Sequence, residues 1–209
     1  MGISVFSNID WEIAHSSIEK CKINLGISTE KITICIGYNG NKNQNHLRVL
    51  EQIKMMPPGI KKKIIVLLPM TYASTEMYIT QVEVVAKETG VKFIVFKEYM
   101  QHEIIAQLRL ATDIFINAQT SDGLSGSVLE TLYAGALLLS ASWLHYVEYD
   151  SWGLKYSTFS KFEDLPGLLA DAINVPFVKR QENREILAGR MSWDQCKSAW
   201  DALLGGGNP

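Results

Sequence analysis

The sequence predicts an α/β domain built on a Rossmann-like, doubly wound parallel sheet of about six strands. Short apolar runs alternate with longer amphipathic stretches along most of the 209 residues. The apolar runs show no polar alternation, which is typical of strands that helices cover on both faces. Right-handed crossovers between such strands give a doubly wound sheet, in which ligands bind beyond the carboxyl ends of the strands.

Five segments are predicted as strands, and a sixth shows the same pattern over a shorter length. The first is a run of β-branched residues that ends at Gly37, and Pro69 closes the second. In chain order the five span residues 32–37, 63–68, 92–96, 113–118 and 136–140, and the short sixth spans residues 154–156.

Helices are predicted between the strands, where apolar residues recur three and four positions apart. Leu47, Leu50 and Ile53 mark the first helix, and Pro57 ends it. Gly90 is a typical residue for a helix C-terminus and ends the second helix. The predicted helices span residues 46–56, 74–89, 102–111, 127–133, 163–173 and 178–204.

The predicted domain organisation follows from these elements. Residues 1–30 form a lead-in segment with a helix over residues 18–25, and residues 31–176 form the Rossmann-like domain. Residues 177–204 form C-terminal helices, and residues 205–209 form a flexible, glycine-rich tail. No internal repeat is present, so one domain with short additions accounts for this length.

The composition excludes several classes of partner. Hydrophobic residues make up 47% of the chain and charged residues 20%, so a packed core is expected rather than disorder. The formal net charge of -2 and the pI of about 6.1 provide no basic excess for nucleic acid or for anionic lipid. No apolar run reaches the ~20 residues that span a bilayer, and the first residues do not form a signal peptide.

The cysteines and histidines predict neither a disulfide framework nor a metal site. Cys21, Cys35 and Cys196 lie far apart, which favours reduced thiols and a cytoplasmic protein. His46 is interpreted as a helix-start or packing residue, with ligand binding as the alternative, and the other histidines are scattered. No dinucleotide-binding or P-loop motif is present, and no serine-hydrolase elbow directly follows a strand.

The loop after the fourth predicted strand holds two carboxylates eight positions apart, Asp122 and Glu130. Gly123 lets the backbone approach a ligand closely, and the start of the following helix offers free amides that suit a diphosphate. A structural interpretation is equally open. Ser127 and Glu130 have the spacing of a capping box, and Asp122-Gly123 is a common turn pair.

The loop after the first predicted strand supplies a second group of candidate binding residues. Gly37 and Gly40 allow a tight turn, and Asn39 is a small polar neighbour. Lys42 precedes the next helix, where an ammonium is a suitable partner for phosphate. Asparagine and glycine also form ordinary surface loops, so this alternative stays open on the local sequence.

Residues 120–135 read T-S-D-G-L-S-G-S-V-L-E-T-L-Y-A-G and resemble the E-x7-E motif of retaining GT-B glycosyltransferases. Those enzymes typically read E-G-F-G-x-x-x-L-E-A-x-A-x-G. The resemblance implies the C-terminal, donor-binding half of a GT-B fold, in which the first acid and the loop amides contact the sugar and phosphates and the second acid binds the ribose. By resemblance, these roles fall to Asp122 as the catalytic residue, to Gly123, Leu124 and Ser125, and to Glu130. Asp122 is one methylene shorter than the glutamate of that motif.

Residues 37–46 read G-Y-N-G-N-K-N-Q-N-H and, with L-P-M-T-Y after the second strand, are similar to another group of transferases. These add 4-acetamido-4,6-dideoxygalactose from its dTDP donor to a lipid-linked sugar, which implies that Asn39, Lys42 and Tyr72 face the donor. Retaining GT-B enzymes usually carry an arginine and a lysine in this loop, both on the diphosphate. Lys42 matches the lysine, and Tyr38 stands where the arginine often is.

The two resemblances imply a glycosyltransferase domain of hexosyltransferase type in surface polysaccharide synthesis. We expect a UDP-, dTDP- or GDP-sugar donor and a saccharide or lipid-linked acceptor. We expect no metal and no cofactor, because loop amides, a helix end and Lys42 would carry the diphosphate charge. The alternative is a non-catalytic nucleotide-sugar-binding or regulatory subunit with a degenerate site, which the replacements at Asp122 and Tyr38 favour.

A GT-B enzyme also needs an acceptor-binding N-terminal half, and 209 residues leave no room for it. We therefore expect the chain by itself to bind a nucleotide sugar and to transfer it poorly. Contact with a membrane is expected only through the full-length enzyme or its acceptor, at the inner face of the membrane.

Overall fold

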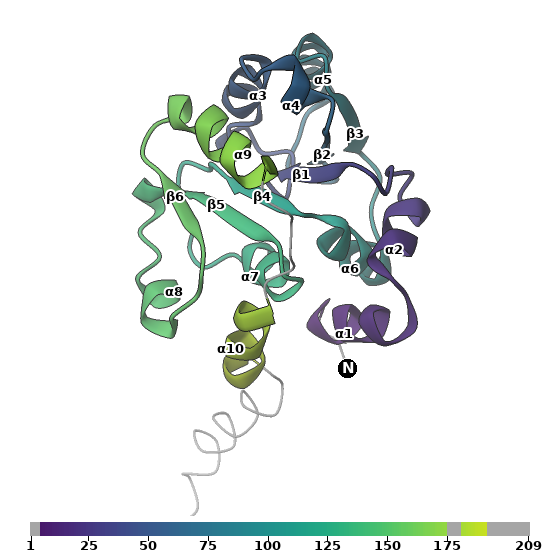
Figure 1. The fold of residues 1–209 in the computed structure, drawn as a ribbon, viewed down its shortest axis with the longest axis vertical. Coiled ribbons are helices and arrows are strands. Elements are labelled where there is room, and N and C mark those ends of the chain that lie inside the picture. Colours follow the sequence, from purple (N-terminus) through teal and green to yellow (C-terminus); the bar gives the residue numbers. More distant parts are fainter. Residues whose placement is uncertain (1–4, 175–180, 192–209) are drawn as a thin grey trace, which may run out of the picture.

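The computed structural model describes residues 5–174 and 181–191, and it confirms the predicted fold class. Within these residues, one sheet of six parallel strands has helices on both faces (Figure 1). The strand order is β3-β2-β1-β4-β5-β6, which is the order of a doubly wound nucleotide-binding domain. The strands are β1 (Ile32–Ile36), β2 (Ile64–Pro69), β3 (Lys92–Phe96), β4 (Ile114–Asn117), β5 (Leu137–Ala141) and β6 (Ser157–Phe159).

Strand β1 lies in the middle of the sheet, where its Ile34 pairs with Val66 of β2 and Ile114 of β4. All three side chains are buried, because helices cover both faces of these strands. From β1 the chain continues outward to β2, whereas β4 continues outward to β5 on the other side. The loops that follow β1 and β4 therefore flank the switch point of the sheet, where doubly wound domains bind their ligands.

The helices form two layers, one on each face of the sheet (Figure 1). One layer contains α3 (His46–Lys54), α5 (Glu76–Glu88) and α9 (Leu165–Asn174). The other contains α1 (Val5–His15), α2 (Ile18–Asn24), α6 (His102–Ala111), α7 (Gly126–Tyr133) and α10 (Gln181–Met191). The short connections are α4 (Pro58–Lys61), α8 (Val147–Trp152) and the 3-10 turns η1 (Lys42–Gln44), η2 (Ser142–Leu144) and η3 (Phe162–Asp164).

A buried ion pair ties the lead-in segment to the sheet. The Lys22 ammonium of α2 lies 2.7 Å from the Asp113 carboxylate, which comes just before β4, and each side chain is 8% exposed. The same carboxylate accepts a hydrogen bond of 2.8 Å from the backbone amide of Thr33 in β1. Lys22 and Asp113 therefore join α2, β1 and β4 at the edge of the sheet that lies opposite the ligand-binding edge.

The predicted sixth strand was placed three residues too early. The backbone of Lys155, within the predicted residues 154–156, is bonded instead to Asn183 of α10, whose side chain accepts from its amide at 2.7 Å and donates to its carbonyl at 2.8 Å. The backbone pairs with β5 only from Ser157 onward. Helix α1 was not predicted, whereas α2 confirms the helix in the lead-in segment.

Part of the predicted C-terminal region can be compared with the structure. Helix α10 falls within the predicted residues 178–204, and the remainder of that stretch and the tail of residues 205–209 lie outside the described residues. Cys21 and Cys35 are free and buried, and Cys196 also lies outside the described residues. None of the helices that the structure describes is long and apolar enough to cross a bilayer.

Candidate functional site

The loops after β1 and β4 are held against each other at the switch point of the sheet. The amide of Thr120 donates to the carbonyl of Asn43 at 2.9 Å, and the Asn45 side chain donates to the carbonyl of Ala118 at 2.7 Å. The Gln44 amide group adds a buried contact of 3.0 Å to Gln119 Oε1. The two sequence segments that resemble donor-binding loops are therefore neighbours in space.

Two glycines predicted for donor binding permit close packing in the loop after β1. Gly37 has a φ of 62°, and a Cβ atom there would lie 2.7 Å from Gln44 Oε1. At Gly40 a Cβ atom would lie 2.2 Å from the Cβ of Ser74. The Gly40 amide also donates to the carbonyl of Tyr72 at 2.9 Å, which joins this loop to the loop after β2. Both positions therefore require glycine for the loop to keep this shape.

The other predicted residues of these two loops differ in how available they are. Asn39 is 8% exposed, and its Oδ1 accepts from the Asn41 amide at 2.9 Å, so this oxygen closes a turn. Tyr72 is 56% exposed, so its side chain is accessible to a ligand. Lys42 is exposed too, but its Nζ lies 5.6 Å from the ring centroid of Tyr78 on α5, and it makes no contact with Asp122.

Asp122 is partly buried, and its carboxylate has a specific partner. The Tyr146 hydroxyl, from the turn after β5, donates to Asp122 Oδ2. The Asn117 side chain at the end of β4 donates to the same hydroxyl at 2.6 Å, and the Tyr146 ring stacks on Tyr149 with centroids 4.2 Å apart. Desolvation, followed by the nearby Asp122 carboxylate, raises the pKa of Tyr146 far above its usual value, so this hydroxyl stays protonated.

Helix α7 begins at Gly126 and has a start that no side chain caps. Ser125 is its N-cap residue but makes no side-chain capping bond, so the alternative of a Ser127–Glu130 capping box is wrong. The carbonyl of Ser127 accepts from the Thr131 hydroxyl at 2.7 Å. Leu124, just before the helix, has a φ of 61°, a left-handed conformation that costs energy for a residue with a side chain.

Glu130 is held by an arginine that the sequence did not single out. Its Oε2 lies 3.2 Å from both Nε and Nη2 of Arg109 on α6, and the two side chains are 18% and 6% exposed. Its other oxygen, Oε1, faces the start of the helix, 4.0 Å from where a Cβ atom of Gly126 would be. One carboxylate oxygen is therefore fixed in an ion pair, and the other is directed toward the uncapped helix start.

Several buried polar atoms at the switch point have no hydrogen-bond partner in the described part of the chain. They are Gln44 Oε1, His46 Nε2, Asn117 Oδ1 and Gln119 Nε2. His46 is fully buried, its Nδ1 lies 3.3 Å from the Tyr78 hydroxyl, and burial lowers its pKa to about 4. These properties support the packing interpretation of His46, since a neutral ring in the core carries no charge for a phosphate.

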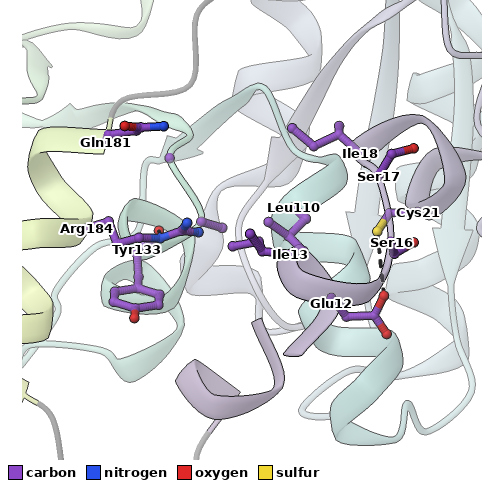
Figure 2. A pocket seen from close by; sticks show the side chains of 12 residues that line it. Glu12, Ile13, Ser16, Ser17, Ile18, Cys21, Leu110, Tyr133, Gln181 and Arg184 are labelled. Atoms are coloured by element: carbon purple, nitrogen blue, oxygen red, sulfur yellow. Dashed lines mark hydrogen bonds between the residues drawn. The ribbon is translucent and has the colours of Figure 1, made fainter. Parts of the chain in front are cut away.

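A separate cavity of about 270 Å³ lies at the far end of α7 (Figure 2). Figure 2 shows Glu12 and Cys21 on one side of it and Tyr133 and Arg184 on the other. Because Tyr133 ends the helix that Gly126 begins, this cavity lies about 10 Å along α7 from the loop of Asp122. The cavity is therefore not part of the candidate site. No cluster of three His, Cys, Asp or Glu side chains that could hold a metal occurs in the residues described.

Three further residues contribute to the candidate site and were not predicted from the sequence. Tyr146, Arg109 and Gln119 each orient another group, and none lies in a recognisable motif. The available signals are weak. Tyr146 belongs to an aromatic run after a predicted strand, and Arg109 interrupts the apolar face of a helix.

No family model and no curated protein matches this sequence. Solved structures of the same architecture do match. A glycosyltransferase from Rickettsia africae matches with a TM-score of 0.73 and 15% identity, over 96% of this chain and 54% of its own. The C-terminal domain of the group 1 glycosyltransferase LpcC from Francisella tularensis matches with a TM-score of 0.67 and 13% identity, over 83% of this chain and 92% of its own. The fold is that of a GT-B C-terminal domain.

A third match is WaaG, a glycosyltransferase involved in lipopolysaccharide biosynthesis, with a TM-score of 0.66 and 17% identity. It covers 90% of this chain and 51% of its own. This chain therefore spans about half the length of WaaG and of the Rickettsia enzyme. The predicted architecture, including its assignment to the C-terminal half of a GT-B fold, is confirmed at the level of the fold.

Proposed function

We propose that this chain is the donor-binding domain of a glycosyltransferase and binds a nucleoside-diphosphate sugar. One observation carries the proposal. Two carboxylates eight residues apart, Asp122 and Glu130, lie on either side of the uncapped start of α7, and each is oriented by a partner from another element. Carboxylates suit hydroxyl groups, and a free helix start suits a diphosphate.

The arrangement supports a specific order of contacts along the donor. The diphosphate would lie on the first amides of α7, where the helix dipole favours negative charge. Oε1 of Glu130 would accept a hydrogen bond from the pentose, and Asp122 would contact the sugar. Lys42 and Tyr72 are exposed on the neighbouring loops and would close over the ligand from the β1 and β2 side. In this scheme Asp122 is the catalytic residue, and amides together with Lys42 replace a metal ion.

Calorimetric titration with UDP, dTDP, GDP and their hexose derivatives tests this proposal directly. We expect saturable binding of one nucleotide series, with affinity lowered roughly tenfold by Glu130→Gln, because a charge-assisted hydrogen bond is worth about that factor. Glu88→Gln is the matched control, since Glu88 is a carboxylate at the end of α5 that pairs with Lys54 and does not reach the candidate site. If none of the nucleotides tested binds, the proposal is wrong.

The full reaction is proposed to need a second, acceptor-binding half. Two of the matching structures are about twice as long as the part that this chain covers. We propose a saccharide or lipid-linked acceptor of surface polysaccharide synthesis, hexosyl transfer in the cytoplasm or at the inner face of the membrane, and a UDP-, dTDP- or GDP-sugar donor. The likeness to the dTDP-linked acetamidosugar transferases belongs to this proposal as well.

A second candidate function is a nucleotide-sugar-binding or regulatory subunit without catalysis. Two observations favour it. The shorter Asp122 side chain is engaged by Tyr146, and Tyr38, in the place of an arginine, donates to Gln119 at 3.2 Å and supplies no positive charge. Transfer measured with an acceptor-binding half present, for the native chain and for Asp122→Glu, separates the two. Activity of the native chain supports the enzyme, and activity of the variant alone supports the degenerate subunit.

A further inference from the structure

A small polar pocket opens at the carboxyl ends of β5 and β6, one strand further out than the loop of Asp122. Its volume is about 120 Å³, which is well below the ~300 Å³ of a typical site for a whole small molecule. Polar side chains make up nearly all of its lining. Its lining includes His145, Tyr146, Asp150, Tyr156 and Thr158.

The pocket and the candidate site share one wall. Tyr146 lines the pocket, and its hydroxyl donates to the Asp122 carboxylate. Its position is fixed, because it is 4% exposed, receives a hydrogen bond from Asn117 and stacks on Tyr149. The Tyr146 side chain therefore lies between Asp122 and the pocket, and a ligand at Asp122 would reach the pocket only with a substituent that extends past this ring.

Three polar side chains of the pocket, those of His145, Asp150 and Thr158, are exposed and so available to a ligand. Asp150 accepts from the Tyr156 hydroxyl at 2.6 Å through Oδ1, which leaves Oδ2 without a hydrogen bond to the described residues. The side chains of His145 and Thr158 have no partner in that part of the chain either. His145 has a φ of 47°, a strained conformation that sets its position at the mouth of the pocket.

From this arrangement we infer that the pocket binds one substituent of the donor sugar and so selects which sugar the domain accepts. The inference rests on the proposed function, since it assumes that a nucleotide sugar lies at Asp122. The chemistry of the pocket fits a hydroxymethyl or acetamido group. Asp150 accepts from a hydroxyl or amide hydrogen, Thr158 and His145 can donate or accept, and the aromatic edges of Tyr146 and Tyr156 contact apolar atoms. The volume of the pocket, about 120 Å³, suits a single substituent better than a complete sugar ring.

The test compares the affinity of a sugar nucleotide with that of the nucleotide lacking the sugar. Calorimetry is carried out on the full chain with UDP, UDP-glucose and UDP-N-acetylglucosamine, and with the dTDP and GDP series. The variants are Asp150→Asn, which keeps an acceptor for Tyr156, and Thr158→Val, which keeps the shape of the side chain. Glu148→Gln is the matched control, because it removes an exposed carboxylate from the same helix and does not line the pocket.

We expect Asp150→Asn to weaken the preferred sugar nucleotide about tenfold and Thr158→Val to weaken it about threefold. Binding of the nucleotide without its sugar stays unchanged in both variants, and Glu148→Gln changes neither affinity. Equal losses for nucleotide and sugar nucleotide, or no loss for either, overturn the inference and leave the proposed function standing. If no nucleotide binds the native chain, the proposed function fails and the inference fails with it. Unchanged thermal unfolding midpoints of the variants exclude misfolding as the cause.

Discussion

Tyr146 donates a hydrogen bond to Asp122, and this contact joins the turn after β5 to the loop after β4. Tyr146 comes from the turn after the adjacent strand β5 and holds the Asp122 carboxylate in place, and Asn117 donates to the same hydroxyl. The carboxylate of Asp122 is thus positioned by a neighbour from another loop.

We expect Tyr146→Phe to weaken sugar-nucleotide binding about tenfold, because the carboxylate loses a charge-assisted bond and its orientation. The loss should shrink when the same substitution is made in an Asp122→Asn chain, since the two residues act through one contact. Calorimetry on the four chains measures this coupling. Tyr99→Phe, at a tyrosine that is 76% exposed, is the control. Equal losses in both backgrounds would show that Tyr146 acts only through packing.

Arg109→Met should lower both stability and nucleotide affinity. It leaves the Glu130 carboxylate, 18% exposed, without its cation, which costs about 3 kcal/mol in the free energy of unfolding. The freed carboxylate also loses its orientation, so we expect nucleotide affinity to fall roughly tenfold. Urea unfolding and calorimetry measure the two effects. If Arg109 acts through Glu130, adding Arg109→Met to Glu130→Gln causes little further loss of affinity, and a full additional loss would contradict this role.

Gly40→Ala should disturb the loop after β1, because the new methyl group would lie 2.2 Å from the Cβ of Ser74. The loop must shift, at a cost of about 1–3 kcal/mol in the free energy of unfolding. Nucleotide affinity should fall as well, since the shift displaces Lys42. Ser74→Gly removes the obstructing atoms, so the double variant should recover most of the stability. If adding Ser74→Gly to Gly40→Ala does not raise the unfolding midpoint, the strain does not come from this contact.

Lys22→Met tests the ion pair that ties the lead-in segment to the sheet. Both partners are 8% exposed, and the substitution removes the ammonium that lies 2.7 Å from the buried Asp113 carboxylate. We expect a loss of about 3–5 kcal/mol in the free energy of unfolding. Lys54→Met removes an ion pair of similar length to Glu88 whose side chains are 48% and 52% exposed, and should cost less than about 1 kcal/mol. Similar losses in the two variants would contradict the role of burial.

Acid should destabilise the chain through His46. Burial lowers its pKa from 6.5 to about 4, so the folded state binds fewer protons than the unfolded state between these values. Its contribution to stability is fully present above about pH 6.5 and is lost as the pH falls toward 4, by roughly 3 kcal/mol in all. We expect the difference in unfolding free energy between the native chain and His46→Gln to narrow over this range. A difference that does not change with pH would show that His46 is not buried in neutral form.

Local sequence patterns predicted most of the architecture. Apolar patterns placed β1, β3 and α6 almost to the residue. In β1, burial on both faces leaves a continuous apolar signal. The sixth strand was misplaced, since the competing partner of its backbone, Asn183, comes from a helix 28 residues away. The local sequence of the strand does not indicate that its backbone has this competing partner.

The sequence predicts candidate site residues within one segment and does not predict contacts between segments. The loop of Asp122 and Glu130 was singled out by its resemblance to a motif, and its position after β4 follows from the strand order. The partners that orient these acids are 24 and 21 residues away, and nothing local marks Tyr146 or Arg109 for that role. The spacing of Ser127 and Glu130 fitted a capping box, but Glu130 faces an arginine on another helix, which a sequence pattern cannot show.

The way Arg109 engages Glu130 has a consequence for the pentose. Two nitrogens of Arg109 bind the same oxygen, Oε2, and use its acceptor capacity. Only Oε1 is left, so under the proposed function a pentose would be bound through this one oxygen and not through both oxygens of the carboxylate. The 3′-hydroxyl is common to ribose and 2′-deoxyribose. If the proposed function holds, the 3′-hydroxyl alone is enough to make this contact with Oε1, in a ribonucleotide donor and in a deoxynucleotide donor alike.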